Sequence, residues 1–314
     1  MKVTIGIPVY NCESWIRESI ASALAQTWLR KEVVVVDDGS DDRTPTVCEE
    51  FGQQIRYVRQ DRRGGNAARN RILSMASGDW IQYLDADDYL LPDKIQNQLE
   101  TLPNEVIDLV LSPTITETWR DGSPITCTTQ EFTPPLDWYR AWIGWRFPQT
   151  GGCLWRKQFL QTLGGWNEEL TCNQDYELYL RALQADARIH YVPTPGAIYR
   201  LWSDRTVSQK DKTAVILGRT TLIKQFLDWL ERKGRTTPDH RREAAITCFE
   251  SARTLATQDL ALATRYYSDR KREGLIEVAG SAAPTRYRLM VGLLGFRAAE
   301  QIAAWNRKRM SAAS

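Results

Sequence analysis

Histidine is nearly absent from this chain, which has only two among its 314 residues. Its six cysteines are scattered, and no two of them stand in a Cys-x-x-Cys pair. Because zinc sites need closely spaced Cys and His ligands, this pattern argues against a structural zinc site. It argues equally against a small disulfide-built fold, and scattered thiols in a chain of this length are typical of a reducing cytosol.

Long hydrophobic runs and an excess of one charge are also missing. No stretch reaches 18 consecutive apolar residues, so no transmembrane helix is expected. The start, MKVTIGIPVYN, has a strand pattern and lacks the apolar core and cleavage site of a signal peptide. With 41 basic and 39 acidic residues, the chain gives no general argument for nucleic-acid binding. We expect a cytoplasmic protein that binds no nucleic acid; composition leaves an oligomer open.

The first 112 residues alternate strand and helix patterns. Strands are predicted over 3–10, 33–36, 55–58 and 80–84, and helices after Asn11, from Thr44 and over 66–76. Repeated β-α-β units favour an α/β fold with a mostly parallel sheet flanked by helices. Ligands of such sheets bind beyond the carboxyl ends of the strands. Tyr10-Asn11, Asp37-Asp38 and Asp85-Ala86-Asp87 follow three of these strands, so we expect them to converge.

The chain is predicted to have two domains. Residues 1–208 would form the α/β domain, with 1–112 and 113–208 as its halves. Residues 209–314 read as a helical C-terminal region with breaks near Gly234–Pro238 and Gly280–Pro284.

Three carboxylates crowd the stretch WIQYLDADDYLLP, and several kinds of site contain such clusters. A calcium loop would need glycine at the sixth position from Asp85, where Leu90 stands. A phosphoryl-transfer pair would normally follow the first strand instead. A divalent cation that bridges a nucleotide diphosphate fits hard oxygen ligands and offsets the clustered charge. A solvated turn that caps the next helix suits Asp88 or Asp93 better than Asp85 and Asp87.

Six motifs in order resemble family 2 glycosyltransferases of the GT-A fold over residues 3–208. They are I-G-I-P-V-Y-N, V-V-V-V-D-D-G-S, N-A-A-R-N, Y-L-D-A-D-D, L-G-G-W-N-E-E-L and Q-D-Y-E-L-Y-L-R. The resemblance implies a Rossmann-like GT-A domain that transfers a sugar from a nucleoside-diphosphate sugar to an acceptor hydroxyl with inversion. UDP is the default nucleotide. The acceptor would be a sugar, a lipid-linked or another glycoconjugate, in polysaccharide or glycolipid biosynthesis.

The resemblance also implies residue roles on the donor side. Pro8, Val9 and Tyr10 would line the nucleotide base, and Tyr10 would stack on it, as an aromatic face at a strand end allows. Ordinary packing at the sheet edge is the alternative for Tyr10. Asp38 would accept a hydrogen bond from the base.

Three further positions match the family near the phosphates. Arg69 would lie near the nucleotide, although an arginine on a helix often forms only a surface ion pair. Asp85 would contact the ribose or the metal, and Asp87 would ligate Mn2+ or Mg2+.

Transfer also needs a base that takes the proton of the acceptor hydroxyl. By resemblance this base is Asp175, at the start of a predicted helix. The alternative is that Asp175 only complements the positive end of that helix. Glu177 is the second candidate, although two positions along a helix it should face elsewhere.

One departure from the family concerns the metal. The family often has a histidine shortly after a Tyr-Arg pair, whereas Tyr199-Arg200-Leu201 is followed by Trp202. Asp204 is another candidate ligand, and Arg200 or Arg205 could share the neutralisation of phosphate. We therefore expect a weakly held cation, and a non-catalytic nucleotide-sugar-binding or scaffolding protein is the alternative function.

Two remaining segments have open interpretations. The aromatic run over 138–145 is either a helix that packs on the domain or an acceptor wall on which sugar rings stack. The basic, apolar segment 285–310 could lie on an anionic membrane at its inner face, dock on the catalytic domain, or form a dimer contact.

Overall fold

The computed structural model describes residues 1–120, 122–129, 137–202 and 211–311. Contacts between residues divide the chain into two compact units. The α/β unit consists of 1–136 and 147–210, and the helical unit consists of 137–146 and 211–314. The predicted division at 208 differs mainly in the segment 137–146, which packs with the C-terminal helices rather than with the acceptor-side half.

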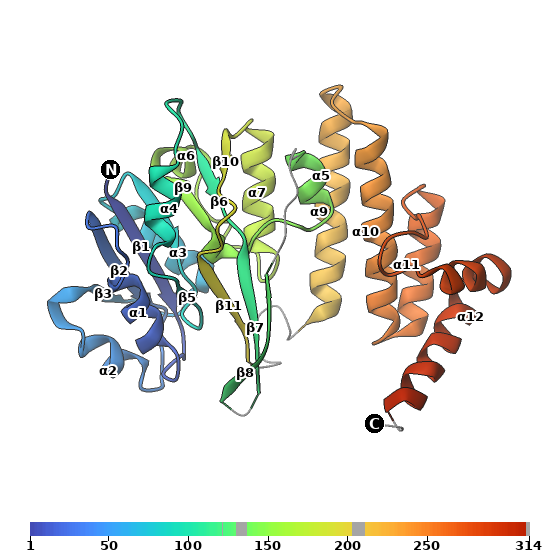
Figure 1. Cartoon of the computed structure of the whole chain (residues 1–314), viewed down its shortest axis with the longest axis horizontal. Helices are drawn as coiled ribbons and strands as arrows, with labels where there is room; N and C mark the ends of the chain where they lie inside the picture. The colour runs from blue at the N-terminus through green and yellow to red at the C-terminus, as the bar shows by residue number, and fades with distance from the viewer. Residues whose placement is uncertain (121, 130–136, 203–210, 312–314) are drawn as a thin grey trace. The chain divides into compact units, whose positions relative to one another are not determined.

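A seven-stranded sheet forms the centre of the α/β unit (Figure 1). Its order is β10-β6-β9-β4-β1-β2-β3, and β9 is antiparallel to both of its neighbours while the other pairs are parallel. The strands are β1 (Val3–Val9), β2 (Lys31–Asp37), β3 (Arg56–Arg59), β4 (Trp80–Tyr83), β6 (Leu109–Leu111), β9 (Cys153–Arg156) and β10 (Ile189–Tyr191). The predicted α/β fold with a mostly parallel sheet is confirmed.

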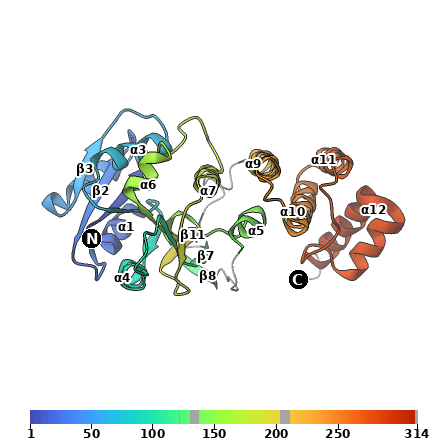
Figure 2. The ribbon, with the colours of Figure 1, turned by 90° about the horizontal axis from the view of Figure 1, so that it is seen from above.

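Alternation along β1 explains how helices cover both faces of this sheet. Ile5 and Ile7 belong to the core that contains Ile16 and Ile20 of α1 (Ile16–Leu24). Gly6 faces the other way, where a Cβ atom would lie 2.3 Å from Ile72 of α3 (Gly65–Met75). Figure 2 shows α1 and α3 on opposite faces of the strands. The unit also contains α2 (Thr44–Glu49), η1 (Gly52–Gln54), α4 (Lys94–Glu100), η2 (Thr150–Gly152), α6 (Lys157–Thr162) and α7 (Gln174–Gln184).

A second sheet begins with the strand that follows the acidic turn of residues 85–88. Its order is β5-β11-β7-β8, formed by β5 (Tyr89–Leu90), β11 (Ala197–Leu201), β7 (Thr114–Arg120) and β8 (Ser123–Thr129). Because β11 pairs with β5, the segment that follows β11 is brought next to the carboxylates that precede β5. Two stretches more than a hundred residues apart therefore meet at one place.

The second unit is helical, as predicted. It contains α5 (Trp138–Ile143), α9 (Lys212–Arg232), α10 (Pro238–Ala256), α11 (Leu260–Arg272) and α12 (Thr285–Ser311). Trp142 of α5 is fully buried, with its ring 5.0 Å from that of Phe226 on α9. For this residue of the aromatic run, the packing interpretation holds. No helix in the described part of the chain is both long and apolar enough to cross a bilayer.

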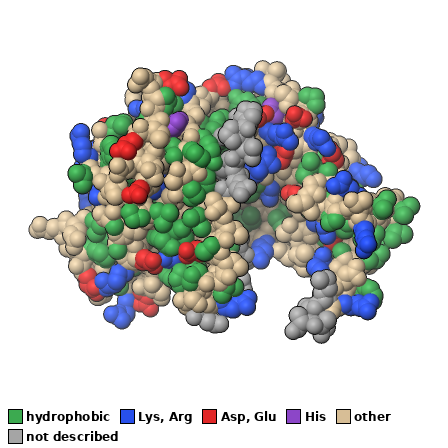
Figure 3. All heavy atoms as spheres, viewed as in Figure 1, with side chains coloured by type: hydrophobic (Ala, Val, Ile, Leu, Met, Phe, Trp, Pro, Cys, Tyr) green, Lys and Arg blue, Asp and Glu red, His purple; other side chains and the backbone are tan. Residues whose placement is uncertain are grey.

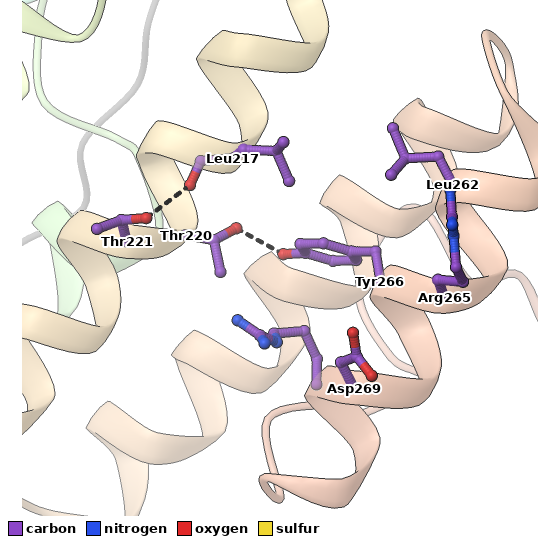
Figure 4. Close-up of a pocket in the computed structure, with 8 residues that line it drawn as sticks. Leu217, Thr220, Thr221, Leu262, Arg265, Tyr266 and Asp269 are labelled. Carbon is purple, nitrogen blue, oxygen red and sulfur yellow. Dashed lines mark hydrogen bonds between the residues drawn. The ribbon is translucent and has the colours of Figure 1, made fainter.

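A pocket of about 310 Å³ lies between α9 and α11 (Figure 4). The hydroxyls of Thr220 and Tyr266 point toward each other across it and form a hydrogen bond of 2.6 Å. None of the site residues predicted from the sequence lines this pocket. The site residues predicted from the sequence all belong to the α/β unit.

Candidate active site

The end of β1 places Tyr10 at the surface, and two hydrogen bonds fix the chain beside it. Pro8 and Val9 are buried, whereas Tyr10 is 36% exposed. Asn11 adopts a left-handed conformation with φ of 46°, and its N–H donates to Ser40 Oγ at 2.9 Å. Cys12 N–H donates to Thr44 Oγ1 at 2.8 Å. The ends of β1 and β2 are thereby joined, as their position in a parallel sheet predicts.

Arg62 lies against the predicted base platform. Its guanidinium carbon is 4.1 Å from the centre of the Tyr10 ring, a cation–π contact. One face of Tyr10 is thus occupied, and a planar ligand would stack on the other face or displace Arg62. Arg62 is not predicted from the sequence; its only signal is its place two positions before Gly64, where the chain turns with φ of 98°.

Asp38 is buried and shapes the loop that carries Arg62. Its carboxylate accepts hydrogen bonds from Gln60 Nε2 at 2.8 Å, Arg63 N at 2.9 Å and Gly64 N at 2.7 Å. A carboxylate has about four acceptor directions, and the described residues fill three of those of Asp38. Gln60 was another residue that sequence reasoning did not identify.

Asp85 forms an ion pair with Arg69 of α3. Arg69 Nη2 is 2.6 Å from Asp85 Oδ1, and its guanidinium carbon lies 4.7 Å from the centre of the Trp166 ring. The Arg69 side chain is only 13% exposed, so this contact is not the surface ion pair that the sequence left open. The Trp166 segment is fixed on α3, because Asn70 exchanges two hydrogen bonds with the Trp166 main chain at 2.8 and 2.9 Å.

Asp87 is half-buried and is approached from β11. Trp202 Nε1 donates to Asp87 Oδ2 at 2.8 Å, and Arg200 Nη1 donates to the Asp87 carbonyl at 3.2 Å. Burial and the neighbouring Asp85 carboxylate raise the pKa of Asp87, while the Trp202 hydrogen bond opposes this rise. Trp202, which stands where the family often has histidine, and Arg200 of the preceding Tyr-Arg pair are therefore both direct partners of Asp87.

Asp88 and Asp93 do not cap the following helix. Asp88 is buried, and its Oδ1 accepts from the backbone N–H of Arg200 at 2.8 Å. Burial and the Asp87 and Asp85 charges raise the pKa of Asp88 well above its usual range. Asp93 directly precedes α4 but makes no capping hydrogen bond through its side chain. The role of Asp88 is to hold β11.

Asp175 lies in the first turn of α7, close enough to Asp85 and Arg69 to interact with their charges. The pKa of Asp175 is raised to about 6, chiefly by burial and also by the Asp85 charge, while the Tyr176 N–H and Arg69 oppose the rise. A carboxylate with a pKa of about 6 is matched to proton abstraction near neutral pH. Glu177 is instead paired with Arg181 at 2.8 Å on the same helix, which occupies the second candidate base.

The donor set fits a cation that arrives with its own phosphate ligands. Trp202 is the one described side chain that hydrogen-bonds to the Asp87 carboxylate, and no group of three or more Cys, His, Asp or Glu in the described ranges could enclose a metal. Mg2+ and similar ions are commonly held by one or two carboxylates together with substrate phosphates and water. Asp87 fits this arrangement. Asp204 and Arg205 lie outside the described residues.

A wide hollow of about 1100 Å³ adjoins the Asp38 turn. Its lining includes four arginines and two acidic residues: Arg59, Arg62, Arg63, Arg71, Asp61 and Glu168. The surplus of cationic side chains favours anionic ligands at this edge of the site.

Residues 4–159 match the sequence model of the family described as Glycosyl transferase family 2. A curated relative, the glycosyltransferase GlyA of Streptococcus pneumoniae, is 36% identical over 110 residues. That match covers 34% of this chain and 15% of the relative, so this chain spans only a small part of it.

Solved structures share the fold at low sequence identity. S. aureus TarS 1-349 in complex with UDP-GlcNAc superimposes with a TM-score of 0.59 at 18% identity, covering 87% of this chain and 88% of TarS 1-349. Mannosyltransferase PcManGT from Pyrobaculum calidifontis, in complex with GDP-Man and Mn2+, gives 0.51 at 16% identity, covering 96% and 86% of the two chains. The likeness confirms the predicted GT-A-type α/β fold with its helical C-terminal part.

Proposed function

Since residues 4–159 match the family model described as Glycosyl transferase family 2, we propose that this chain moves a sugar from a nucleoside-diphosphate sugar to an acceptor hydroxyl with inversion. The observation that carries the proposal is the meeting of Asp175 with Asp85 and Arg69. It unites a half-buried carboxylate of pKa about 6 with the predicted donor residues, although ninety positions separate Asp85 from Asp175. The fold neighbours bound to UDP-GlcNAc and GDP-Man support a sugar-nucleotide donor.

The donor site is assigned to the ends of β1, β2 and β4. Tyr10 would stack on the base through the face that Arg62 leaves free, with Pro8 and Val9 behind it. Asp38 would accept from the base through its remaining acceptor direction. Asp85, held by Arg69, would meet the ribose. UDP is the first choice of nucleotide, and TDP and GDP follow.

In the reaction, the acceptor oxygen attacks the anomeric carbon while the bond from that carbon to the diphosphate oxygen breaks. Asp175 takes the acceptor proton, and the diphosphate leaves with the bonding electrons. The chain contributes positioning and a preformed electrostatic environment. Mn2+ or Mg2+, when bound by Asp87, supplies neutralisation of the leaving diphosphate. Arg200 is not assigned to the phosphates, because its guanidinium is buried beneath Asp87.

The acceptor is assigned to a class only: a sugar, a lipid-linked sugar or another glycoconjugate in polysaccharide or glycolipid assembly. The enzyme would act in the cytoplasm, peripherally at the inner face of the membrane. The first half of α12 favours this location, because Leu289, Leu293 and Leu294 are 62%, 83% and 56% exposed. Exposed Arg286 and Arg297 flank them, an arrangement suited to anionic lipid. Figure 3 shows hydrophobic side chains next to basic ones at the end occupied by α12.

A thermal-shift screen of UDP, TDP and GDP sugars followed by a turnover assay tests the proposal. A sugar nucleotide that binds the folded chain must raise its unfolding temperature. Release of the nucleoside diphosphate on addition of acceptor is the expected result. Binding without turnover across a broad acceptor panel would instead identify the alternative, a nucleotide-sugar-binding or scaffolding protein.

A further inference from the structure

The end of β11 is attached to the acidic turn by three hydrogen bonds. Trp202 Nε1 donates to the Asp87 carboxylate at 2.8 Å, Arg200 Nη1 to the Asp87 carbonyl at 3.2 Å, and Arg200 N to Asp88 Oδ1 at 2.8 Å. Trp202 thus holds the side chain of Asp87, and Arg200 holds its main chain. Neither an arginine nor a tryptophan side chain is a usual ligand of a divalent cation.

Arg200 is immobilised by the aromatic residues around it. The residue is 1% exposed, and its guanidinium carbon lies 4.7, 4.4 and 5.2 Å from the ring centres of Trp15, Tyr89 and Trp119. Glu18 completes the surroundings, with an Nη2–Oε2 distance of 2.5 Å. Because this guanidinium is enclosed, the Asp87 carbonyl that it binds has a fixed position.

Trp202 then fixes the carboxylate itself. The residue is 39% exposed and its indole ring lies 5.7 Å from that of Trp15, so one ring contact helps to orient the N–H. The hydrogen bond is made to Asp87 Oδ2, and no other described side chain hydrogen-bonds to the carboxylate. An indole N–H donates a hydrogen bond but cannot ligate a metal ion, so Trp202 can hold the carboxylate without competing with it for a cation.

We propose that Trp202 is a positioning residue that fixes the direction of the Asp87 carboxylate, so that a divalent cation arriving with the donor's diphosphate binds through Oδ1 alone. The inference rests on the proposed function, because it requires a cation that comes with a nucleotide. Partners that orient a ligating carboxylate typically contribute about 10- to 100-fold to metal affinity. Trp202 thus stands where a histidine ligand is common in the family and acts instead by holding the Asp87 carboxylate.

A pair of matched variants tests this role. Trp202→Phe keeps an aromatic ring but removes the N–H that binds Asp87. Trp28→Phe makes the same change away from the acidic turn, where the indole N–H donates to the Met1 carbonyl at 3.3 Å. The readout is the affinity for Mn2+, measured by the loss of the free-ion electron paramagnetic resonance signal with UDP, GDP or TDP present in turn.

The expected result is a loss of Mn2+ affinity of about 10- to 100-fold in Trp202→Phe and no change in Trp28→Phe. Trp202→His should retain at least the wild-type affinity, because imidazole can donate to Asp87 or ligate the ion. This third variant also provides the test if Trp202→Phe does not fold.

Three outcomes would overturn the inference, and a fourth would overturn only the proposed activity. Equal affinity in Trp202→Phe and wild type would reduce Trp202 to a packing residue, and tighter binding would mean that the indole obstructs the cation. If wild type holds Mn2+ with none of the three diphosphates, the proposed metal site fails and the inference fails with it. Nucleotide-dependent Mn2+ binding without sugar transfer would refute only the proposed activity.

Discussion

Arg69 Nη2 lies 2.6 Å from Asp85 Oδ1, and this pair joins α3 to the acidic turn after β4. Arg200 lies below the neighbouring Asp87 on the same turn. Two arginines from distant parts of the chain thus offset part of the carboxylate charge before any cation binds. The Asp87 carboxylate is the one on which we expect a cation to bind.

Loss of the Arg69 guanidinium should destabilise the α/β unit. Arg69→Met would leave the Asp85 carboxylate without its partner at a site only partly open to water, and we expect a loss of about 1–3 kcal/mol in the free energy of unfolding. Urea unfolding measures it. The matched control is Arg63→Met, which breaks the pair with Glu168 between side chains 65% and 39% exposed and should cost under about 1 kcal/mol. Equal losses in the two variants would contradict the prediction.

Removal of the proposed base should separate binding from turnover. Asp175→Asn keeps the size of the side chain but cannot take a proton, so release of nucleoside diphosphate should fall by about 10²- to 10⁴-fold. Donor binding, followed by thermal shift, should persist. Glu177→Gln is the control, since Glu177 is bound to Arg181, and its activity should stay within a few-fold of wild type. If Glu177→Gln lost more activity than Asp175→Asn, Glu177 and not Asp175 would be the base.

Activity should fall on the acidic side with a midpoint near pH 6. Burial, supported by Asp85, raises the pKa of Asp175 to about 6, and the residue acts as a base only when deprotonated. The rate should therefore be constant above this pH and decline about tenfold per unit well below it. The measurement is kcat/KM between about pH 4.5 and 8, with the concentrations of metal ion and donor held constant. A flat profile down to pH 5 would exclude Asp175 as the titrating base.

The buried Lys94 should make stability rise with pH. Lys94 is 2% exposed, its Nζ contacts Gln82 Oε1, and burial lowers its pKa to about 7. Between pH 7 and 10 the unfolded chain holds a proton that the folded chain lacks, so this residue's contribution to stability increases with pH. Relative to Lys94→Met, wild type should gain on the order of 3 kcal/mol over this range. Urea unfolding at both limits checks it; a constant difference would be inconsistent with a lowered pKa.

The exposed leucines of α12 should contribute to membrane binding. The double variant Leu293→Ser with Leu294→Ser removes apolar surface while leaving Arg286 and Arg297 in place. We expect weaker co-sedimentation with phosphatidylglycerol vesicles. Leu29→Ser, a change at an 89% exposed leucine of the α/β unit, is the control and should bind like wild type. Unchanged binding of the double variant would refute this surface.

Much of the fold could be predicted because its signals are local. The Val33–Val36 run and the apolar spacing after Asn11 follow from alternation in a buried strand and periodicity in a helix, and both elements are present. The motif order pointed to the same family that residues 4–159 match. The carboxyl ends of β1 and β2 meet because parallel strands bring their ends to one edge.

What the sequence by itself determined is therefore the element pattern and the set of candidate residues, because these depend on spacing along the chain. It showed that Trp202 stands where a histidine is common, but it did not show what the indole does. Only the tertiary structure decided that Trp202 donates to Asp87, that Arg69 pairs with Asp85, and that Asp38 holds the loop of Arg62. These contacts depend on which strands pair and which helix covers which face, and they join residues far apart in the chain.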